Sequence, residues 1–102
     1  MTEKEAAIFL NLIPGLGSIK IKKLRDYFGS FSKAANAPKS ELLKVEGITY
    51  KIAQDIVDKN VEFDKELDLI QKNKIQILTV EDETYPENLK SIYDPPAVLY
   101  VK

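Results

Sequence analysis

The chain has 102 residues, with 15 Lys and Arg against 16 Asp and Glu, and it contains no Cys and no His. Disulfides, Cys/His zinc sites and histidine acid–base catalysis are therefore excluded. Since no apolar run is long enough for a membrane span and the acidic start MTEKEAAIFL is unlike a signal peptide, we expect a cytoplasmic protein with no membrane partner.

The charge is unevenly divided along the chain. Residues 1–60 hold ten basic and seven acidic residues, a balance of +3, whereas residues 61–102 hold five and nine, a balance of −4. Such asymmetry is typical of two units with different roles. We therefore predict a helical domain over residues 1–72 and a second unit over residues 73–102.

Apolar periodicity and capping residues predict the helices of the first unit. Thr2 and Glu5 have the spacing of a capping box ahead of a helix at about 3–12. Ser18 is the expected cap of a helix at 18–28, which Gly29 ends. The remaining helices are expected at 31–36 after Ser30, from Pro38 to about 44, at 50–57, and at 61–72, the last either separate or continuing the one before it, and ended by Asn73.

The pattern changes at residue 74. The β-branched run 75–80 and the apolar run 97–101 predict two strands, with a short helix over Pro86–Ile92 between them. A connection of 16 residues is long enough for a parallel return, and the apolar second strand suggests burial on both faces. Because two strands cannot cover a buried sheet, we expect an N-terminal piece of a longer α/β protein; the alternative is a complete protein ending in an edge strand.

The segment IPGLGSIK, residues 13–20, places two of the four glycines within three positions. Glycine tolerates the positive φ of a sharp turn, and a helix that begins at Ser18 adds unpaired N–H groups and a positive dipole end. These features predict a helix-hairpin-helix in which Leu16 is buried and the backbone from Gly15 through Gly17 to Ser18 binds phosphate.

Basic residues surround this turn. Residues 18–33 contain five basic residues and a single acidic one, Asp26. The basic residues are Lys20, Lys22, Lys23, Arg25 and Lys33. We predict that the first four of these basic residues bind DNA phosphates together with the turn, in contacts that do not depend on the base sequence. The alternative is an ordinary solvated helix face beside an ordinary turn.

A second copy of the hairpin follows 32 residues later. Gly47 aligns with Gly15, Ile48 with Leu16, and Ile56 with Leu24. Thr49 replaces Gly17 and Glu46 replaces Pro14, so this turn is less permissive and more acidic. We therefore expect the second hairpin to be structural, or to contact DNA only weakly through Gly47, Thr49 and Lys51.

The most distinctive signal is the run YPxxLxxIxDPPxVLYxK over residues 85–102. This run resembles the start of the Rossmann-like domain of the DNA processing protein A family (DprA, also called Smf), whose opening region carries a helical domain of helix-hairpin-helix or sterile-alpha-motif (SAM) type. The resemblance extends over the whole chain. It implies a mostly α fold, in which a tandem helix-hairpin-helix domain precedes the first two strands and short helix of a truncated Rossmann-like α/β domain.

The resemblance also implies a function for the parent protein. A member of this family binds incoming single-stranded DNA, protects it from nucleases and helps load the RecA recombinase during natural transformation. The main DNA surface, the RecA-contacting surface and the homodimer surface belong to the part of the Rossmann-like domain beyond Lys102. The resemblance implies no enzymatic activity and no cofactor, and it gives the present helical domain an accessory role.

Two other classes of function stay open. The acidic side chains at positions 62, 64, 66 and 68 favour a protein-interaction domain with a basic partner. A nuclease or ligase module with tandem hairpins is a third option, but it leaves the run at residues 85–102 unexplained. We expect Tyr85 and Asp94 to cap loops rather than to catalyse, and the acidic run 81–83 to be solvated rather than to bind a cation.

Overall fold

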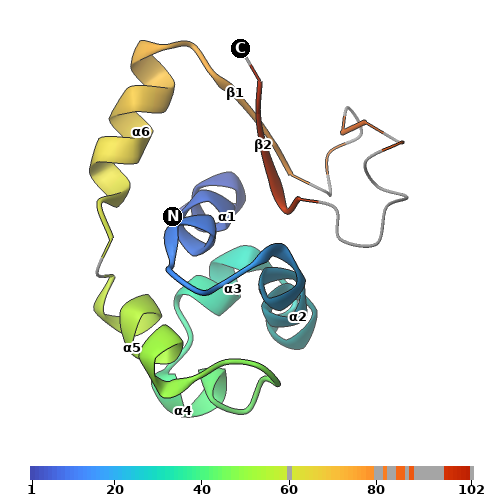
Figure 1. Ribbon diagram of the computed structural model, residues 1–102, viewed down its shortest axis with the longest axis vertical. Coiled ribbons are helices and arrows are strands. Elements are labelled where there is room, and N and C mark those ends of the chain that lie inside the picture. The colour runs from blue at the N-terminus through green and yellow to red at the C-terminus, as the bar shows by residue number, and fades with distance from the viewer. Residues whose placement is uncertain (60, 80–81, 83–84, 87, 89–95, 102) are drawn as a thin grey trace.

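The computed structural model describes residues 1–59, 61–79, 82, 85–86, 88 and 96–101. In this part the chain is mostly helical with one small sheet, which confirms the mostly α fold class (Figure 1). No helix among these residues is long and apolar enough to cross a membrane. In chain order the elements are α1 (Glu3–Leu12), α2 (Ser18–Phe28), α3 (Phe31–Ala35), α4 (Lys39–Leu42), α5 (Tyr50–Asp58), α6 (Phe63–Lys72), β1 (Gln76–Thr79) and β2 (Val98–Val101).

Local capping accounts for most helix starts. The Thr2 hydroxyl accepts the Glu5 N–H at 3.1 Å, and the Glu5 carboxylate accepts the Thr2 N–H at 2.8 Å, so the predicted capping box is present. Ser30 caps α3 as expected. The prediction that Ser18 caps α2 is wrong: the extended residue that precedes the helix is Gly17, with φ −78° and ψ 173°, and Ser18 is already helical.

One cap comes from a distant part of the chain. The Glu3 carboxylate, on α1, accepts the N–H groups of Phe31 at 2.8 Å and Ser32 at 2.9 Å. These are the first two amides of α3, which lack partners within their own helix. Glu3 therefore links α1 to α3, a contact between residues 28 and 29 positions apart that no local pattern indicates.

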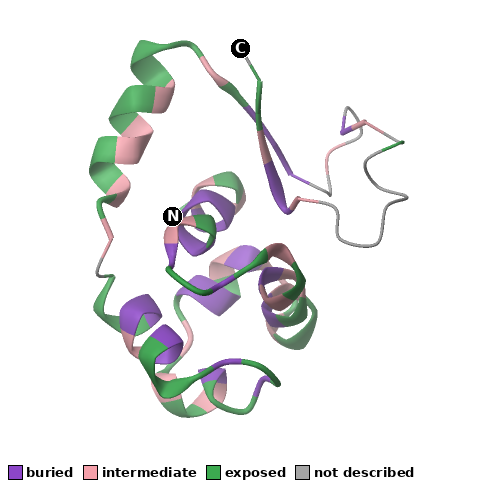
Figure 2. Ribbon diagram, in the orientation of Figure 1, coloured by how far each residue is buried: buried purple, intermediate pink, exposed green. Residues whose placement is uncertain are grey.

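The two predicted hairpins form equivalent turns. The Leu16 N–H donates to the Ile13 carbonyl and the Ile48 N–H to the Val45 carbonyl, both at 3.2 Å. Leu16 is 5% exposed and Ile48 is 7% exposed, so both predicted apolar plugs are confirmed. The first unit is α1–turn–α2, the second is α4–turn–α5, and α3 connects them around one core (Figure 2).

Helix α6 is separate from α5. The backbone turns left-handed at Lys59, with φ 54°, and this ends α5. None of the residues of α6 is fully buried, although Leu67 and Ile70 pack partly against the core. The helix runs as an arm from α5 to β1 along one side of the molecule (Figure 1).

The predicted parallel pairing of the two strands is wrong. Strands β1 and β2 are antiparallel, with Gln76 opposite Val101 and Thr79 opposite Val98. Two hydrogen bonds hold described residues at the ends of the strands. The Asp82 carboxylate accepts the Thr79 N–H at 2.7 Å directly after β1, and the Tyr85 hydroxyl donates to the Pro96 carbonyl at 2.6 Å just before β2.

The second strand is also less buried than its composition suggested. Ala97 and Val98 are buried, but Tyr100 and Val101 are each 39% exposed. Ile77, Ala97 and Val98 share one hydrophobic cluster with the helices, and the division at residue 72 stays a prediction. Most of the predicted helix over Pro86–Ile92, together with Asp94, lies outside the described residues.

Candidate nucleic-acid interface

The two glycines of the first turn have different roles. Gly15 has φ +81°, a left-handed conformation that side chains disfavour, and it is therefore required by the turn. Gly17 has φ −78°, which any residue can adopt, and among the described residues nothing lies within 4 Å of a Cβ added there. As the N-cap of α2, Gly17 supplies no side-chain cap, and the positive end of the helix dipole lies at this turn.

The two hairpins pack against each other in a reciprocal manner. A Cβ on Gly15 would lie 3.7 Å from Ile52 of α5, and a Cβ on Gly47 would lie 3.4 Å from Lys20 of α2. Lys20 and Ile52 are equivalent positions in the 32-residue repeat, so each turn packs on the second helix of the other unit. This reciprocal packing brings the first hairpin's basic helix against the second hairpin's turn.

Two of the predicted DNA contacts, Lys20 and Lys23, lie where the hairpins meet. The aliphatic chain of Lys20 covers Gly47, and its ammonium lies 3.5 Å from the Gly15 carbonyl oxygen. The Lys23 ammonium lies 3.9 Å from the carboxylate of Glu46, with the two side chains 45% and 92% exposed. Exposed pairs of this kind contribute little, so Lys23 can exchange Glu46 for a phosphate at small cost.

The other two basic residues of α2 differ from each other. Lys22 lines a shallow depression on the helix surface together with Ile19, Lys23 and Asp26. Arg25 instead places its guanidinium 5.7 Å from the centre of the Phe31 ring and 3.3 Å from the Asp26 carboxylate, and its side chain is only 21% exposed. Arg25 thus helps to pack α2 on α3, and it is the least suited of the predicted contacts.

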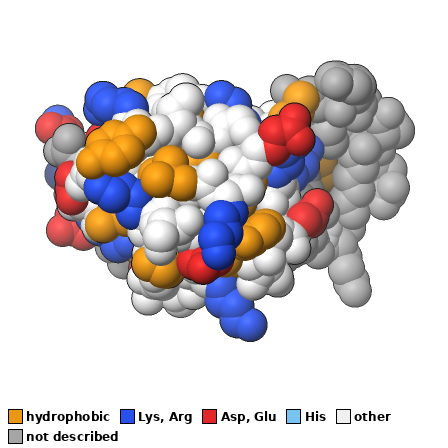
Figure 3. Space-filling view, turned by 90° about the horizontal axis from the view of Figure 1, so that it is seen from below, with side chains coloured by type: hydrophobic (Ala, Val, Ile, Leu, Met, Phe, Trp, Pro, Cys, Tyr) orange, Lys and Arg blue, Asp and Glu red, His pale blue; other side chains and the backbone are white. Residues whose placement is uncertain are grey.

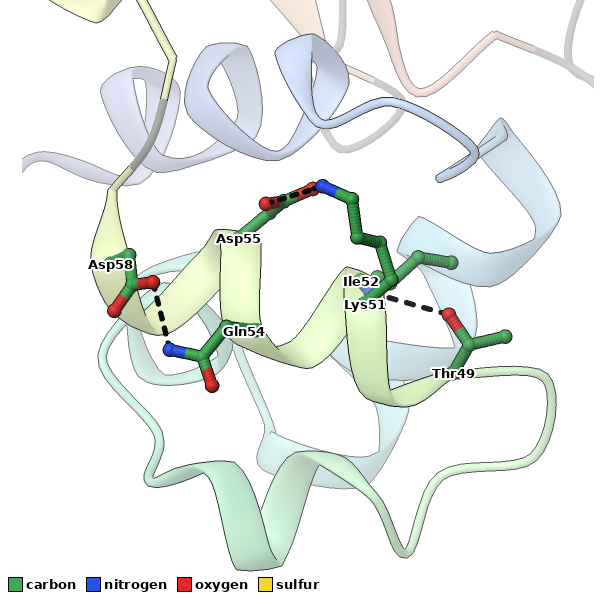
Figure 4. Close-up of polar contacts among 6 residues, drawn as sticks. All are labelled: Thr49, Lys51, Ile52, Gln54, Asp55 and Asp58. Atoms are coloured by element: carbon green, nitrogen blue, oxygen red, sulfur yellow. Dashed lines mark hydrogen bonds and ion pairs between the residues drawn. The ribbon is translucent and has the colours of Figure 1, made fainter.

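In the second hairpin, groups at the start of α5 already have partners within the chain (Figure 4). The Thr49 hydroxyl accepts the Ile52 N–H at 3.2 Å, which occupies an amide at the start of α5. The Lys51 ammonium is held by both oxygens of Asp55, at 2.9 and 3.0 Å, and Asp55 is buried. With Glu46 exposed in the turn, the geometry of Gly47, Thr49 and Lys51 favours a structural role for this hairpin.

The surface around the hairpins carries no single dominant charge. On the face shown in Figure 3, Lys and Arg side chains are scattered among exposed hydrophobic and acidic ones. The net charge of the chain is −1. A phosphate contact would therefore depend on the local geometry of the first hairpin rather than on a broad positive field.

Of the other candidates from the sequence, Tyr85 and Asp82 lie among the described residues. Tyr85 is 1% exposed, burial raises the pKa of its hydroxyl, and this hydroxyl donates to the Pro96 carbonyl. The Asp82 carboxylate accepts the Thr79 N–H and lies 3.9 Å from the Lys4 ammonium. Among the described residues no group of three acidic side chains is placed to hold a metal ion.

Two helix-hairpin-helix units packed turn against helix define a tandem-hairpin module. Along 98% of its length the chain is 32% identical to Protein Smf of Synechocystis sp., and it spans 26% of that protein. It is also 45% identical over 49 residues to UvrABC system protein C of Alkaliphilus oremlandii and 48% identical over 46 residues to the protein of that name from Hydrogenovibrio crunogenus. These two matches cover 48% and 45% of this chain, and each covers 8% of the relative.

The match to Protein Smf over nearly the whole chain confirms the resemblance to the DNA processing protein A (Smf) family and supports membership of it. The chain spans about a quarter of the length of that relative. No family model matches the chain, and no solved structure matches it significantly.

Proposed function

We propose that this chain is an accessory DNA-binding module of a DNA-processing protein and that it contacts the sugar–phosphate backbone through its first hairpin. The observation that carries the proposal is the difference between the two turns. The start of α2 has no side-chain cap and lies beside Lys20, Lys22 and Lys23, whereas the start of α5 is capped by Thr49. Such contacts position a nucleic acid without selecting its sequence.

The proposal for the whole protein rests on the family. We propose that it binds incoming single-stranded DNA, protects it and helps to load RecA in natural transformation, acting as a homodimer in the bacterial cytoplasm. The module described here has no catalytic step and no cofactor in this scheme. The similarity to Protein Smf supports the family part of the proposal, and the lack of a side-chain cap at the start of α2 supports direct contact with DNA.

The test is a titration of fluorescein-labelled single-stranded and double-stranded DNA with the chain at several salt concentrations. Non-specific binding of this kind has dissociation constants of about 10⁻⁴–10⁻⁶ M at physiological salt and tightens as salt falls. The triple variant Lys20→Glu/Lys22→Glu/Lys23→Glu should bind more weakly. For a single strand its salt dependence should be shallower by about two in the slope of log K against log salt, since each lost phosphate contact removes about 0.7.

A matched control separates local contacts from overall charge. The variant Lys65→Glu/Lys72→Glu/Lys74→Glu changes the net charge by the same amount, on and just after α6. It should bind more tightly than the first variant at every salt concentration. Equal binding by the two triple variants, or no binding by the wild type at low salt, would show that the first hairpin is not a DNA contact.

A second candidate is a protein-interaction domain. Its support is the surface of α6, where Glu62, Asp64 and Asp68 are exposed and no residue of the helix is fully buried. A basic partner would complement this face. If no DNA binds at low salt while a lysine-rich peptide binds in a salt-dependent manner that Asp64→Lys/Asp68→Lys abolishes, this candidate replaces the first.

A further inference from the structure

One face of α2 runs along the segment that leads into the second turn. Lys20, Lys23 and Tyr27 have the spacing i, i+3, i+7, which places them on one side of a helix. Lys20 covers Gly47 and Lys23 reaches Glu46. The pKa of Lys44, earlier in the same segment, is raised chiefly by its hydrogen bond to Glu41 and to a smaller extent by the charge of Tyr27. The two contacts follow the segment in order and Tyr27 continues the same helix face, so the face forms a line at the junction of the hairpins.

This line combines cations with an exposed aromatic ring. The side chains of Lys23 and Lys44 are 45% and 61% exposed. Tyr27 is 50% exposed, and the neighbouring Phe28 supports its ring edge-on, with the ring centres 4.8 Å apart and the planes at 73°. A tyrosine ring held half in solvent on the same helix face as lysines presents a π-surface to which a second ring can stack.

The other exposed tyrosine of the helical region offers a useful contrast. Tyr50 is 64% exposed, but the Lys39 ammonium lies 4.3 Å from the centre of its ring and 2.9 Å from its hydroxyl oxygen. The π-surface of Tyr50 is thus already in contact with a cation. Tyr27 and Tyr50 therefore form a matched pair, one on the basic line and one engaged within its own unit.

We infer that Tyr27 is a stacking site for an unpaired nucleobase of single-stranded DNA, whose flanking phosphates lie against Lys20, Lys23 and Lys44. Aromatic side chains beside a basic track bind single strands because every base has a π-face, whereas in a duplex the bases are stacked on one another. The inference rests on the proposed function and adds to it the strand preference and the residue that produces it.

The experiment compares three labelled probes of identical length: a single strand, the duplex with its complement, and a single strand with abasic sites in place of all nucleotides but those carrying the label. Each is titrated at low salt with the wild-type chain and with the variants Tyr27→Leu, Tyr27→Phe and Tyr50→Leu. The abasic strand keeps the phosphates and lacks the bases, so it isolates stacking from charge. Far-ultraviolet circular dichroism checks that each variant folds.

We expect Tyr27→Leu to bind the normal single strand about 5- to 150-fold more weakly, as stacking of one base is worth about 1–3 kcal/mol. Its affinity for the duplex and for the abasic strand should equal that of the wild type. Tyr27→Phe and Tyr50→Leu should bind all three probes like the wild type.

Three outcomes would overturn the inference. They are unchanged binding of the normal strand by Tyr27→Leu, an equal loss for the normal and abasic strands, and an equal loss in Tyr50→Leu. If any of these occurs while the triple lysine variant still loses affinity for every probe, the proposed function stands and only the stacking site is wrong. Absence of wild-type binding to all probes overturns both.

Discussion

The two glycines of the first turn should respond very differently to alanine. Gly15 has φ +81°, and holding an alanine there costs about 1–2 kcal/mol of folding free energy. The added Cβ would lie 3.7 Å from Ile52, an ordinary van der Waals distance, so no steric term increases this cost. For a domain of this size the expected fall in melting temperature is about 4–16 °C.

Gly17→Ala should cost much less. The backbone at Gly17 suits any residue, and no described residue lies within 4 Å of an added Cβ, so the expected cost is the poorer capping tendency of alanine, at about 0.5 kcal/mol. Gly17→Thr copies the cap of the second hairpin into the first, and it should stabilise the chain slightly while weakening DNA binding, because the hydroxyl would occupy an amide at the start of α2.

Urea unfolding followed by far-ultraviolet circular dichroism measures the stability differences, and the DNA titration measures the binding. Equal losses of stability in Gly15→Ala and Gly17→Ala would refute the assignment of different roles to the two glycines. A Gly17→Thr variant that is more stable and binds DNA as well as the wild type would show that the start of α2 is not used.

Three further changes test the fold. Leu16→Ala should lower the unfolding free energy by about 2–5 kcal/mol in urea titrations, because the side chain is buried in the core, and a loss below about 1 kcal/mol would contradict its role as a plug. Glu3→Ala should cost about 1–3 kcal/mol by removing the acceptor of two α3 amides, and hydrogen exchange at the Phe31 and Ser32 amides should accelerate more than elsewhere. The Thr2 backbone N–H, followed by the Thr2 hydroxyl, holds the pKa of Glu5 below its usual 4.5. The stability that ionised Glu5 contributes is therefore present above pH 4.5 and is lost as pH falls through the lowered pKa. The stability advantage of the wild type over Glu5→Gln should shrink in that acidic range; a constant difference in urea unfolding from pH 7 to about 3 would contradict this linkage.

The sequence by itself determined the features that depend on near neighbours. The capping box of Thr2 and Glu5, the cap at Ser30 and the stop at Gly29 involve residues within one turn of each other, so composition and spacing are sufficient to predict them. The 32-residue repeat predicted both hairpin turns, because each needs a glycine with positive φ, at Gly15 and Gly47. It also predicted the burial of the apolar residue that follows each glycine, Leu16 and Ile48. The family resemblance was also a property of the sequence alone.

The tertiary structure was needed to see which basic side chains remain available for DNA contact and how the two strands pair. In the sequence Arg25 is indistinguishable from the other basic residues of α2, but in the structure it packs against Phe31 of α3. The strands are antiparallel, and the length and composition of the connection between them did not reveal this pairing. Lys20 lies over Gly47, and Tyr27 extends the same line, only because two hairpins pack turn against helix. Each of these contacts joins residues that are not helical neighbours, and its free energy depends on a geometry that periodicity does not encode.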